Sequence, residues 1–410
     1  QNQRKEIPGI FCYNVGEMRE NQLKEGGRYS MKITDLTMVP AGKYLFIQVH
    51  TDEGITGIGE IGSWGFIDGT VGVLEKFRQY LIGQDPFRIE HHWQYMYRSM
   101  YFRGSIIMSA ISAIDIALWD IKGKALGVPV YELLGGKCRD KVRSYGAVFQ
   151  FTPEDMAKGC LELKEQGFTA ARLMITGDVR QRTTGIQEDI YNLKVQSYVD
   201  KVAACREAVG EDFDFCLEVH RSMNPAEAVA FGRSVEQYRP LFLEDPIPPD
   251  QVDVMAQVAS QVAVPIATGE RAINIQEMEQ IMVKKAARYV RPDVCALGGI
   301  SPCKKVAAMA EANYVGIVPH NPLGPVSTAA CLQLDACIPN FTIQEFPSFY
   351  LSGGESAMLK EPLQVENGYI LIPDKPGIGI ELAEDITEKF PPKQRSINAQ
   401  ISYDGSVRDL

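Results

Sequence analysis

Six ionisable side chains stand at the ends of short apolar runs, and their spacing constrains the fold more than any other feature. They are Glu218, Glu244, Glu270, Asp293, His320 and Glu345. The steps between them are about 25 residues, which is room for one β-strand, one helix and two loops, the repeating unit of a parallel barrel. Active sites of such barrels lie at the carboxyl ends of the strands. The sequence therefore predicts that these six side chains meet at one barrel mouth.

The repeat divides the chain into regions. Residues 1–30 are polar and read as an N-terminal extension, residues 31–62 alternate as an antiparallel meander, and 70–136 carry helical periodicity. From about residue 142 strands alternate with helices, and beyond about 350 the repeat is lost. Eight strands predict a closed barrel. The doubly wound α/β alternative is disfavoured, because no Gly-rich phosphate loop follows the first strand.

Composition excludes several classes of function. The 410 residues carry a net charge of −10, which argues against nucleic acids or anionic membranes as partners and favours a small molecule. Nine cysteines without CxxC spacing indicate buried thiols in a reducing compartment. The apolar run at 106–119 is interrupted by Asp115 and predicts a buried helix, not a membrane span. We expect a cytoplasmic protein, since no signal peptide is visible.

Three of the strand-end residues predict a metal site. A single glutamate on a barrel rim is more often one half of a salt bridge. Glu218, Glu244 and Glu270 end three consecutive strands, however, and would repel one another without a cation. Carboxylate oxygens with no Cys or clustered His nearby suit Mg²⁺, with coordination positions left for substrate.

Two histidines are candidates for proton transfer. His220 follows Glu218 by two residues, which on a continued strand directs both side chains to one face. His320 ends the seventh strand, opposite the third in an eight-stranded barrel. Asp293, one strand earlier, can accept the second N–H of His320 and raise its basicity. A structural His–Asp pair is the alternative.

Two opposed bases beside a metal that binds a carboxylate suggest removal of the proton α to that carboxylate. If both groups act on one carbon, the outcome is racemisation. If one acts on the α-carbon and the other on a β-hydroxyl, the outcome is loss of water. The residues alone leave both open.

Several sequence segments resemble the enolase superfamily, specifically the mandelate racemase group and within it the acid-sugar dehydratases of the galactonate dehydratase type. The resemblance covers residues 31–410. Its segments are LIGQDP at 81–86, YFRG at 101–104, ALWDIKGK at 117–124, ATGER at 267–271, PHNPLGP at 319–325, QE at 344–345 and DGSV at 404–407.

The resemblance implies a modified TIM barrel, (β/α)7β, over 141–350. An α+β capping domain over 31–140 and a C-terminal segment over 351–410 that returns to it complete the expected fold. It also implies an Mg²⁺-dependent hydro-lyase that converts an aldonate to a 2-keto-3-deoxy acid. The expected steps are α-proton abstraction and β-elimination of water through a metal-stabilised enediolate. The family's assemblies imply a homo-oligomer, with an octamer among the expected forms.

The family's roles carry over residue by residue. The three glutamates match the metal ligands, His320 with Asp293 the base, His220 the acid that assists the leaving hydroxyl, and Glu345 a residue that contacts the substrate or enolate. Further substrate contacts are expected from Arg172, Arg271, Asn321 and Trp64.

The chain also departs from the family pattern. Glu218 stands where galactonate dehydratases usually carry aspartate, and Met174 occupies a place where racemases carry a basic lysine. Met174 cannot accept a proton, which disfavours a Lys/His racemase. The alternatives are a mannonate-type dehydratase using Arg172 and Tyr191, an epimerase using both histidines, or a binding protein that has lost turnover.

Overall fold

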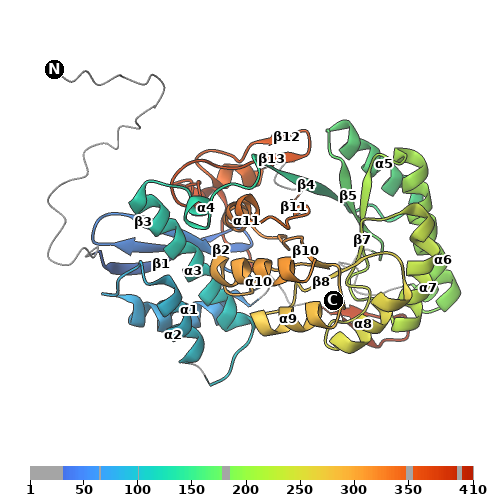
Figure 1. Cartoon of the computed structure of the whole chain (residues 1–410), viewed down its shortest axis with the longest axis horizontal. Helices are drawn as coiled ribbons and strands as arrows, with labels where there is room; N and C mark the ends of the chain where they lie inside the picture. Colours follow the sequence, from blue (N-terminus) through green and yellow to red (C-terminus); the bar gives the residue numbers. More distant parts are fainter. Residues whose placement is uncertain are drawn as a thin grey trace, which may run out of the picture.

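The structure is a computed structural model that describes residues 31–63, 66–99, 101–177, 185–347, 354–394 and 399–409. Trp64 and the predicted extension over residues 1–30 lie outside these ranges. Figure 1 shows an N-terminal domain, coloured blue to teal, beside a barrel coloured green to orange. The C-terminus lies near α7 and α8 on the barrel side.

The N-terminal domain is built on a three-stranded antiparallel sheet. Its strands are β1 (Ile33–Ala41), β2 (Tyr44–Thr51) and β3 (Thr56–Glu60), in the order β1-β2-β3. The predicted meander is thus confirmed. Both faces of β2 are covered: Leu45, Ile47 and Val49 are buried in one core cluster, whereas Tyr44 and Phe46 are buried in another, on the opposite face.

Helices cover this sheet. They are α1 (Ile67–Leu81), α2 (Ile89–Arg98), α3 (Ser105–Leu126) and the short α4 (Val130–Leu133). The long α3 is the buried helix predicted around residues 106–119, and it lies directly on β3. A Cβ on Gly59 would stand 2.0 Å from the carbonyl oxygen of Ala113, so glycine is required for this close approach.

Eight parallel strands form the barrel. They are β4 (Lys141–Val148), β5 (Ala170–Met174), β6 (Asp214–Glu218), β7 (Phe242–Glu244), β8 (Ile266–Thr268), β9 (Tyr289–Val290), β10 (Gly316–Ile317) and β11 (Gln344–Glu345). Hydrogen-bonded pairing runs in sequence order from β4 to β10, and β11 pairs with β4. A parallel bridge between Ile317 and Phe341 joins the ends, which closes the barrel.

A helix follows each of the first seven barrel strands, which confirms the (β/α)7β pattern. The helices are α5 (Pro153–Glu165), α6 (Tyr191–Val209), α7 (Pro225–Val235), α8 (Val252–Gln261), α9 (Ile275–Val283), α10 (Ile300–Ala312) and α11 (Pro325–Cys337). Short 3₁₀ turns lie at Ile186–Glu188, Glu236–Tyr238 and Gly354–Met358. The barrel interior is packed with side chains from its strands, among them Tyr145, Cys216, Phe242 and Ile343.

The C-terminal segment contacts both domains. Strands β12 (Val365–Glu366) and β13 (Tyr369–Leu371) form a hairpin, and β13 extends the sheet antiparallel to β4. Helix α13 (Ile386–Lys389) precedes two backbone hydrogen bonds that join residues 390 and 393 to the β1–β2 turn. A last hairpin of β14 (Gln400–Ile401) and β15 (Val407–Arg408) follows. The predicted domain boundaries near 30, 140 and 350 stay a prediction.

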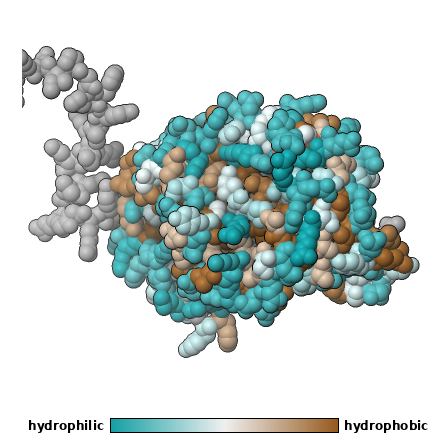
Figure 2. All heavy atoms as spheres, turned by 45° about the vertical axis from the view of Figure 1, so that its right-hand side comes forward, coloured by the Kyte–Doolittle hydropathy of each residue, from teal (hydrophilic) through white to brown (hydrophobic). Residues whose placement is uncertain are grey.

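Three further observations concern the surface, the helices and the cysteines. The face shown in Figure 2 is mostly hydrophilic, with smaller hydrophobic areas between polar ones. Within the described ranges no helix is long and apolar enough to cross a membrane. The eight cysteines that fall in these ranges are all free thiols.

Candidate active site

Three carboxylates converge at the barrel mouth. Glu218 and Glu244 end the neighbouring strands β6 and β7 in register, and Glu270 lies two residues beyond β8. One oxygen of each lies within 4.8 Å of the others, and the first two side chains are fully buried. Parallel strands in register bring about this convergence, because their carboxyl ends lie side by side at the rim.

The triad fits a hard cation. Burial raises the pKa of Glu218 to about 7 and moves the pKa of Glu244 well above its usual value, since neither carboxylate is fully compensated. Oε2 of Glu244 has no hydrogen-bond or ion-pair partner within the described residues. Buried acceptors without donors are costly, and a cation held by carboxylate oxygens satisfies them.

Arginine side chains partly offset this negative charge. Arg291, directly after β9, is fully buried with Nε 2.7 Å from Oε1 of Glu244 and Nη2 2.6 Å from Oε2 of Glu345. Its Nη1 donates to the hydroxyl of Tyr145 at 3.0 Å. Arg172 on β5 lies 2.9 Å from the other oxygen of Glu345.

Two guanidinium groups therefore bind Glu345, at the end of the eighth strand. Burial alone would raise its pKa, but Arg172 and Arg291 outweigh that effect and lower the pKa to about 2. Glu345 is consequently an anion at neutral pH. It is placed to orient Arg172 at the mouth, whose Nη1 also lies 3.5 Å from Oε2 of Glu218.

The predicted His–Asp pair is present in the geometry. Nδ1 of His320 lies 2.8 Å from Oδ2 of Asp293, whose Oδ1 accepts the N–H of Cys295 at 2.7 Å. Nε2 of His320 faces the triad, 3.4 Å from Oε2 of Glu270. Burial lowers the pKa of His320, but the charge of Glu270 and the Asp293 hydrogen bond outweigh it and raise the pKa to about 9. Asp293 fixes the tautomer that leaves Nε2 available toward the site.

His220 reaches the site by a different backbone path from the one predicted. The expectation of a continued strand was wrong, because β6 ends at Glu218 and both His220 and Arg221 have positive φ, 51° and 64°. The turn lets the His220 N–H donate to Oε1 of Glu218 at 2.6 Å. Its ring nitrogens lie 3.0 and 3.1 Å from Nη2 of Arg221.

The protonation state of His220 also differs from expectation. The role of acid implied by the resemblance needs a protonated ring, whereas burial and the charge of Arg221 lower the pKa of His220 to about 3. Arg221 itself is held by Asp245 at 3.3 Å and by Glu270. Without bound substrate or cation, the His220 ring is neutral.

The residues predicted to contact the substrate have different surroundings in the structure. Arg172 lies in the site. The buried Asn321 donates its backbone N–H to Glu345 at 2.9 Å and its side-chain N–H to Thr328 at 2.9 Å. Arg271 forms a bidentate pair with Asp409 of the C-terminal tail, at 2.8 and 2.5 Å.

The two residues suggested for a mannonate-type mechanism differ in exposure. Tyr191, at the start of α6, is about half exposed (49 %), whereas Arg172 is buried between two glutamates. Arg221, Asp245 and Arg291 were not singled out from the sequence as site residues. Their signal was position, because each stands beside a predicted strand-end residue.

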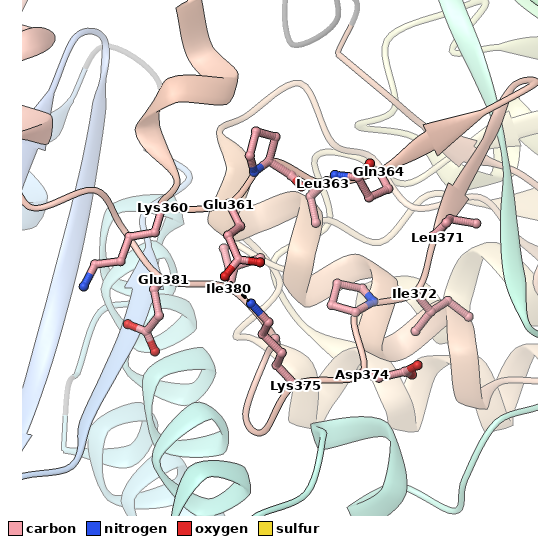
Figure 3. A pocket seen from close by; sticks show the side chains of 13 residues that line it. Lys360, Glu361, Leu363, Gln364, Leu371, Ile372, Asp374, Lys375, Ile380 and Glu381 are labelled. Carbon is pink, nitrogen blue, oxygen red and sulfur yellow. Dashed lines mark hydrogen bonds and ion pairs between the residues drawn. The ribbon is translucent and has the colours of Figure 1, made fainter.

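A surface pocket lies elsewhere, in the C-terminal segment. It is lined by residues 360–364, 371–375 and 379–381. Figure 3 shows Lys375 paired with Glu361, at 2.5 Å. The other charged side chains of the pocket pair with residues outside it, namely Lys360 with Glu384, Asp374 with Lys137 and Glu381 with Lys124. The barrel mouth, with its convergent ionisable groups, is the better candidate for chemistry.

The fold and the mouth together define a class of protein. Residues 28–135 match the family model described as mandelate racemase / muconate lactonizing enzyme, N-terminal domain, and residues 155–386 match the one described as enolase C-terminal domain-like. The chain belongs to this family of the enolase superfamily.

Its relatives narrow the class. The D-galactonate dehydratase of Verminephrobacter eiseniae is 39 % identical over 362 residues, covering 86 % of this chain and 93 % of that protein. The one from Xanthomonas oryzae pv. oryzae is 38 % identical over 390 residues, covering 92 % and 100 %. The chain is a dehydratase, a hydro-lyase of the enolase superfamily, and these relatives support a sugar acid as its class of substrate.

Solved structures agree with this placement. A member of the enolase superfamily from Salmonella Typhimurium superposes with a TM-score of 0.83 at 32 % identity, covering 88 % of this chain and 98 % of that one. An enolase from Agrobacterium radiobacter with bound Na and L-malate gives 0.85 at 30 % identity, covering 92 % and 100 %.

Proposed function

We propose that the protein is a Mg²⁺-dependent dehydratase that converts an aldonate of the galactonate type to a 2-keto-3-deoxy acid. The observation that carries the proposal is one barrel mouth with a carboxylate triad on one side and the Asp293–His320 pair facing it at 3.4 Å. The similarity to D-galactonate dehydratases supports this substrate type.

The three glutamates would hold the cation. They offer oxygen donors only, and the unsatisfied Oε2 of Glu244 suits a small, hard ion that keeps some coordination positions open. The cation supplies Lewis-acid stabilisation of the negative charge that develops on the substrate carboxylate when the α-proton leaves.

His320 is the proposed base for the α-proton. Its Nδ1–H is fixed on Asp293, so Nε2 is the atom that accepts the proton. Asp293 stabilises the resulting imidazolium through the same hydrogen bond. When the charge of Glu270 is offset in the loaded enzyme, the main cause that raises the pKa of His320 is weakened, which favours the neutral ring that a base requires.

His220 is the proposed acid for the β-hydroxyl. Hydroxide is a poor leaving group and needs a proton as the C–O bond breaks. A substrate anion beside Arg221 offsets the positive charge that now depresses the pKa of His220, so substrate binding favours its protonation. Arg172, held by Glu345, is placed to bind the anionic substrate.

We also propose an assembly and a cellular location for the protein. The resemblance to the family supports a cytoplasmic homo-oligomer, with an octamer among the expected forms. Size-exclusion chromatography with light scattering measures the assembly directly.

A screen of aldonates tests the proposed reaction. Purified protein, stripped of metal and supplied with MgCl₂, is incubated with stereoisomeric aldonates, and 2-keto-3-deoxy acids are assayed. A galactonate-type acid should be consumed only when Mg²⁺ is present. Turnover that is unaffected by chelation, or recovery of an epimer in place of a keto acid, contradicts the proposal.

A further inference from the structure

Two buried carboxyl groups of the N-terminal domain bind the amino ends of the barrel helices α10 and α11. We propose that Glu60 and Asp115 are positioning residues for the Asp293–His320 pair, because each binds the amino end of the helix that follows one of the two loops bearing this pair. The inference rests on the proposed role of His320. The contact of α3 with α10 can be followed in Figure 1.

Glu60 binds the start of α11. It is the last residue of β3 and is fully buried. Its Oε1 accepts the N–H of Gly324 at 2.6 Å, and Oε2 accepts the N–H of Ser327 at 2.8 Å. Gly324 follows His320 by four residues, so this bond fixes the far end of the His320 loop.

Asp115 binds the start of α10 in the same manner. It lies in the middle of α3, fully buried, and its Oδ1 accepts the N–H of Ser301 at 3.0 Å while Oδ2 accepts the Ser301 hydroxyl at 2.5 Å. A Cβ on Gly299, whose φ is 102°, would lie 2.2 Å from Oδ1 of Asp115. Gly299 therefore allows the carboxylate to reach the end of the Asp293 loop.

The two helices depend on these external partners. Three barrel helices carry their own capping side chains, namely Thr152 for α5, Asn224 for α7 and Asn274 for α9, whereas α6 and α8 have none. Helices α10 and α11 begin at Gly299 and Gly324, which have no capping side chain. Their free N–H groups are satisfied from the other domain, by carboxyl oxygens of Glu60 and Asp115.

A consequence for catalysis follows from this arrangement. Asp293 and His320 each lie on a loop between a barrel strand and the next helix. The strand holds one end of the loop, and the other end is held by a helix that the N-terminal domain caps. The pair must keep a 2.8 Å hydrogen bond while Nε2 is aimed at the substrate. Loosening either helix start lets the two loops move independently, and small misplacements of a base cost rate steeply.

The same helix provides a matched control. Asp120 is also buried on α3, where its oxygens accept the N–H of Ile58 at 3.0 Å and of Ile378 at 2.9 Å. These partners lie in the N-terminal domain and the C-terminal segment, away from the loops that carry Asp293 and His320. Asp120 also pairs with Lys124 at 2.8 Å. Asp120→Asn therefore removes a buried carboxylate from the same helix without touching those loops.

The test uses Glu60→Gln, Asp115→Asn and Asp120→Asn in the full chain, with Ser301→Ala as a milder change at the Asp115 contact. Hydrogen–deuterium exchange of peptides covering 293–301 and 320–327 measures loop order without reference to activity. Steady-state kinetics with an accepted aldonate give kcat and KM. Melting temperature records the general loss of stability.

The first two variants should exchange the loop amides at least about tenfold faster and lower kcat by about tenfold, with KM changed by less than about threefold. Asp120→Asn should lower the melting temperature yet leave loop exchange and kcat near wild type, and Ser301→Ala should show a smaller effect on the 293–301 peptides. Loops in Glu60→Gln and Asp115→Asn that stay as protected as in Asp120→Asn overturn the positioning role. If the loops exchange faster but kcat is unchanged, the positioning of the loops has no catalytic consequence, and the role of His320 is overturned with it. A wild type that carries out no dehydration contradicts the proposed function alone.

Discussion

Arg291 and Glu244 form a fully buried ion pair beneath the carboxylate triad, with Nε and Oε1 2.7 Å apart. The same guanidinium also binds Glu345, so one cation links the second triad residue to the end of the eighth strand. A buried pair of this kind is costly to break, because either partner alone is an uncompensated charge. It explains how three carboxylates can lie together before a metal ion is bound.

Replacing Arg291 should show how far the triad depends on its charge. Arg291→Met is expected to destabilise the metal-free protein by about 3–5 kcal/mol, the usual cost of removing one partner of a buried pair. Mg²⁺ should restore more stability to the variant than to the wild type, since it takes over the compensation of Glu244. Urea unfolding with and without MgCl₂ measures both effects. An equal Mg²⁺ increment in the two proteins argues against the shared role.

Removing one triad carboxylate should weaken metal binding. Glu244→Gln is expected to lower Mg²⁺ affinity at least about tenfold, because it replaces a charged oxygen donor with a neutral one. Isothermal titration calorimetry gives the affinity, and Glu207→Gln, an exposed change on α6, is the charge-matched control. Unaltered affinity in Glu244→Gln would place the cation elsewhere.

Loss of His220 should separate the two proposed proton transfers. His220→Asn is expected to lower formation of the keto acid by about 10²–10⁴-fold, the usual contribution of a general acid. Slow exchange of the substrate α-proton through His320 should remain. NMR in deuterated water follows both events in one sample. If exchange disappears together with the product, His220 acts on the α-carbon.

Stability should respond to pH through Glu60. Burial raises its pKa to about 8 from an ordinary 4.5, with contributions from Asp293 and Glu355, against the lowering effect of its two backbone donors. Between these values the folded chain holds a proton here that the unfolded chain releases, so stability falls as pH rises through the window. The Glu60→Gln variant has no titrating carboxyl group at this position, so it lacks this fall in stability with rising pH.

The free energy of unfolding of wild type minus that of Glu60→Gln should therefore decrease from about pH 5 to pH 8. Urea titrations across this range provide the values. The exposed Glu53→Gln serves as the control and should show a constant difference from wild type. A difference for Glu60→Gln that stays constant from pH 5 to pH 8 would mean that Glu60 is ionised throughout.

The sequence predicted what is periodic. The barrel, its order of strands and the convergence of Glu218, Glu244 and Glu270 follow from strand-end spacing, because parallel strands align their carboxyl ends. The Asp293–His320 contact follows from the adjacency of two strands.

What the sequence did not reveal depends on contacts between distant segments. Nothing local indicates that Arg291 pairs across the barrel with Glu345, or that Arg271 is held by Asp409, 138 residues later. The backbone of His220 was misjudged because β6 stops at the metal-ligand position, where a turn with positive φ begins. Capping of α11 by Glu60, 264 residues before Gly324, is equally invisible to local pattern.

The central claim is that His320 removes the α-proton of the substrate. The most direct measurement is NMR of an accepted aldonate in deuterated water with wild type, His320→Asn and, as control, His50→Asn, whose ring binds Thr37 and Thr56 in the N-terminal domain. Wild type and control should yield a 2-keto-3-deoxy acid that carries one solvent deuteron at C3, while His320→Asn should lose both product and α-proton exchange, by at least about 10²-fold. Exchange of the α-proton at the wild-type rate in His320→Asn, or an epimer as the wild-type product, would contradict it.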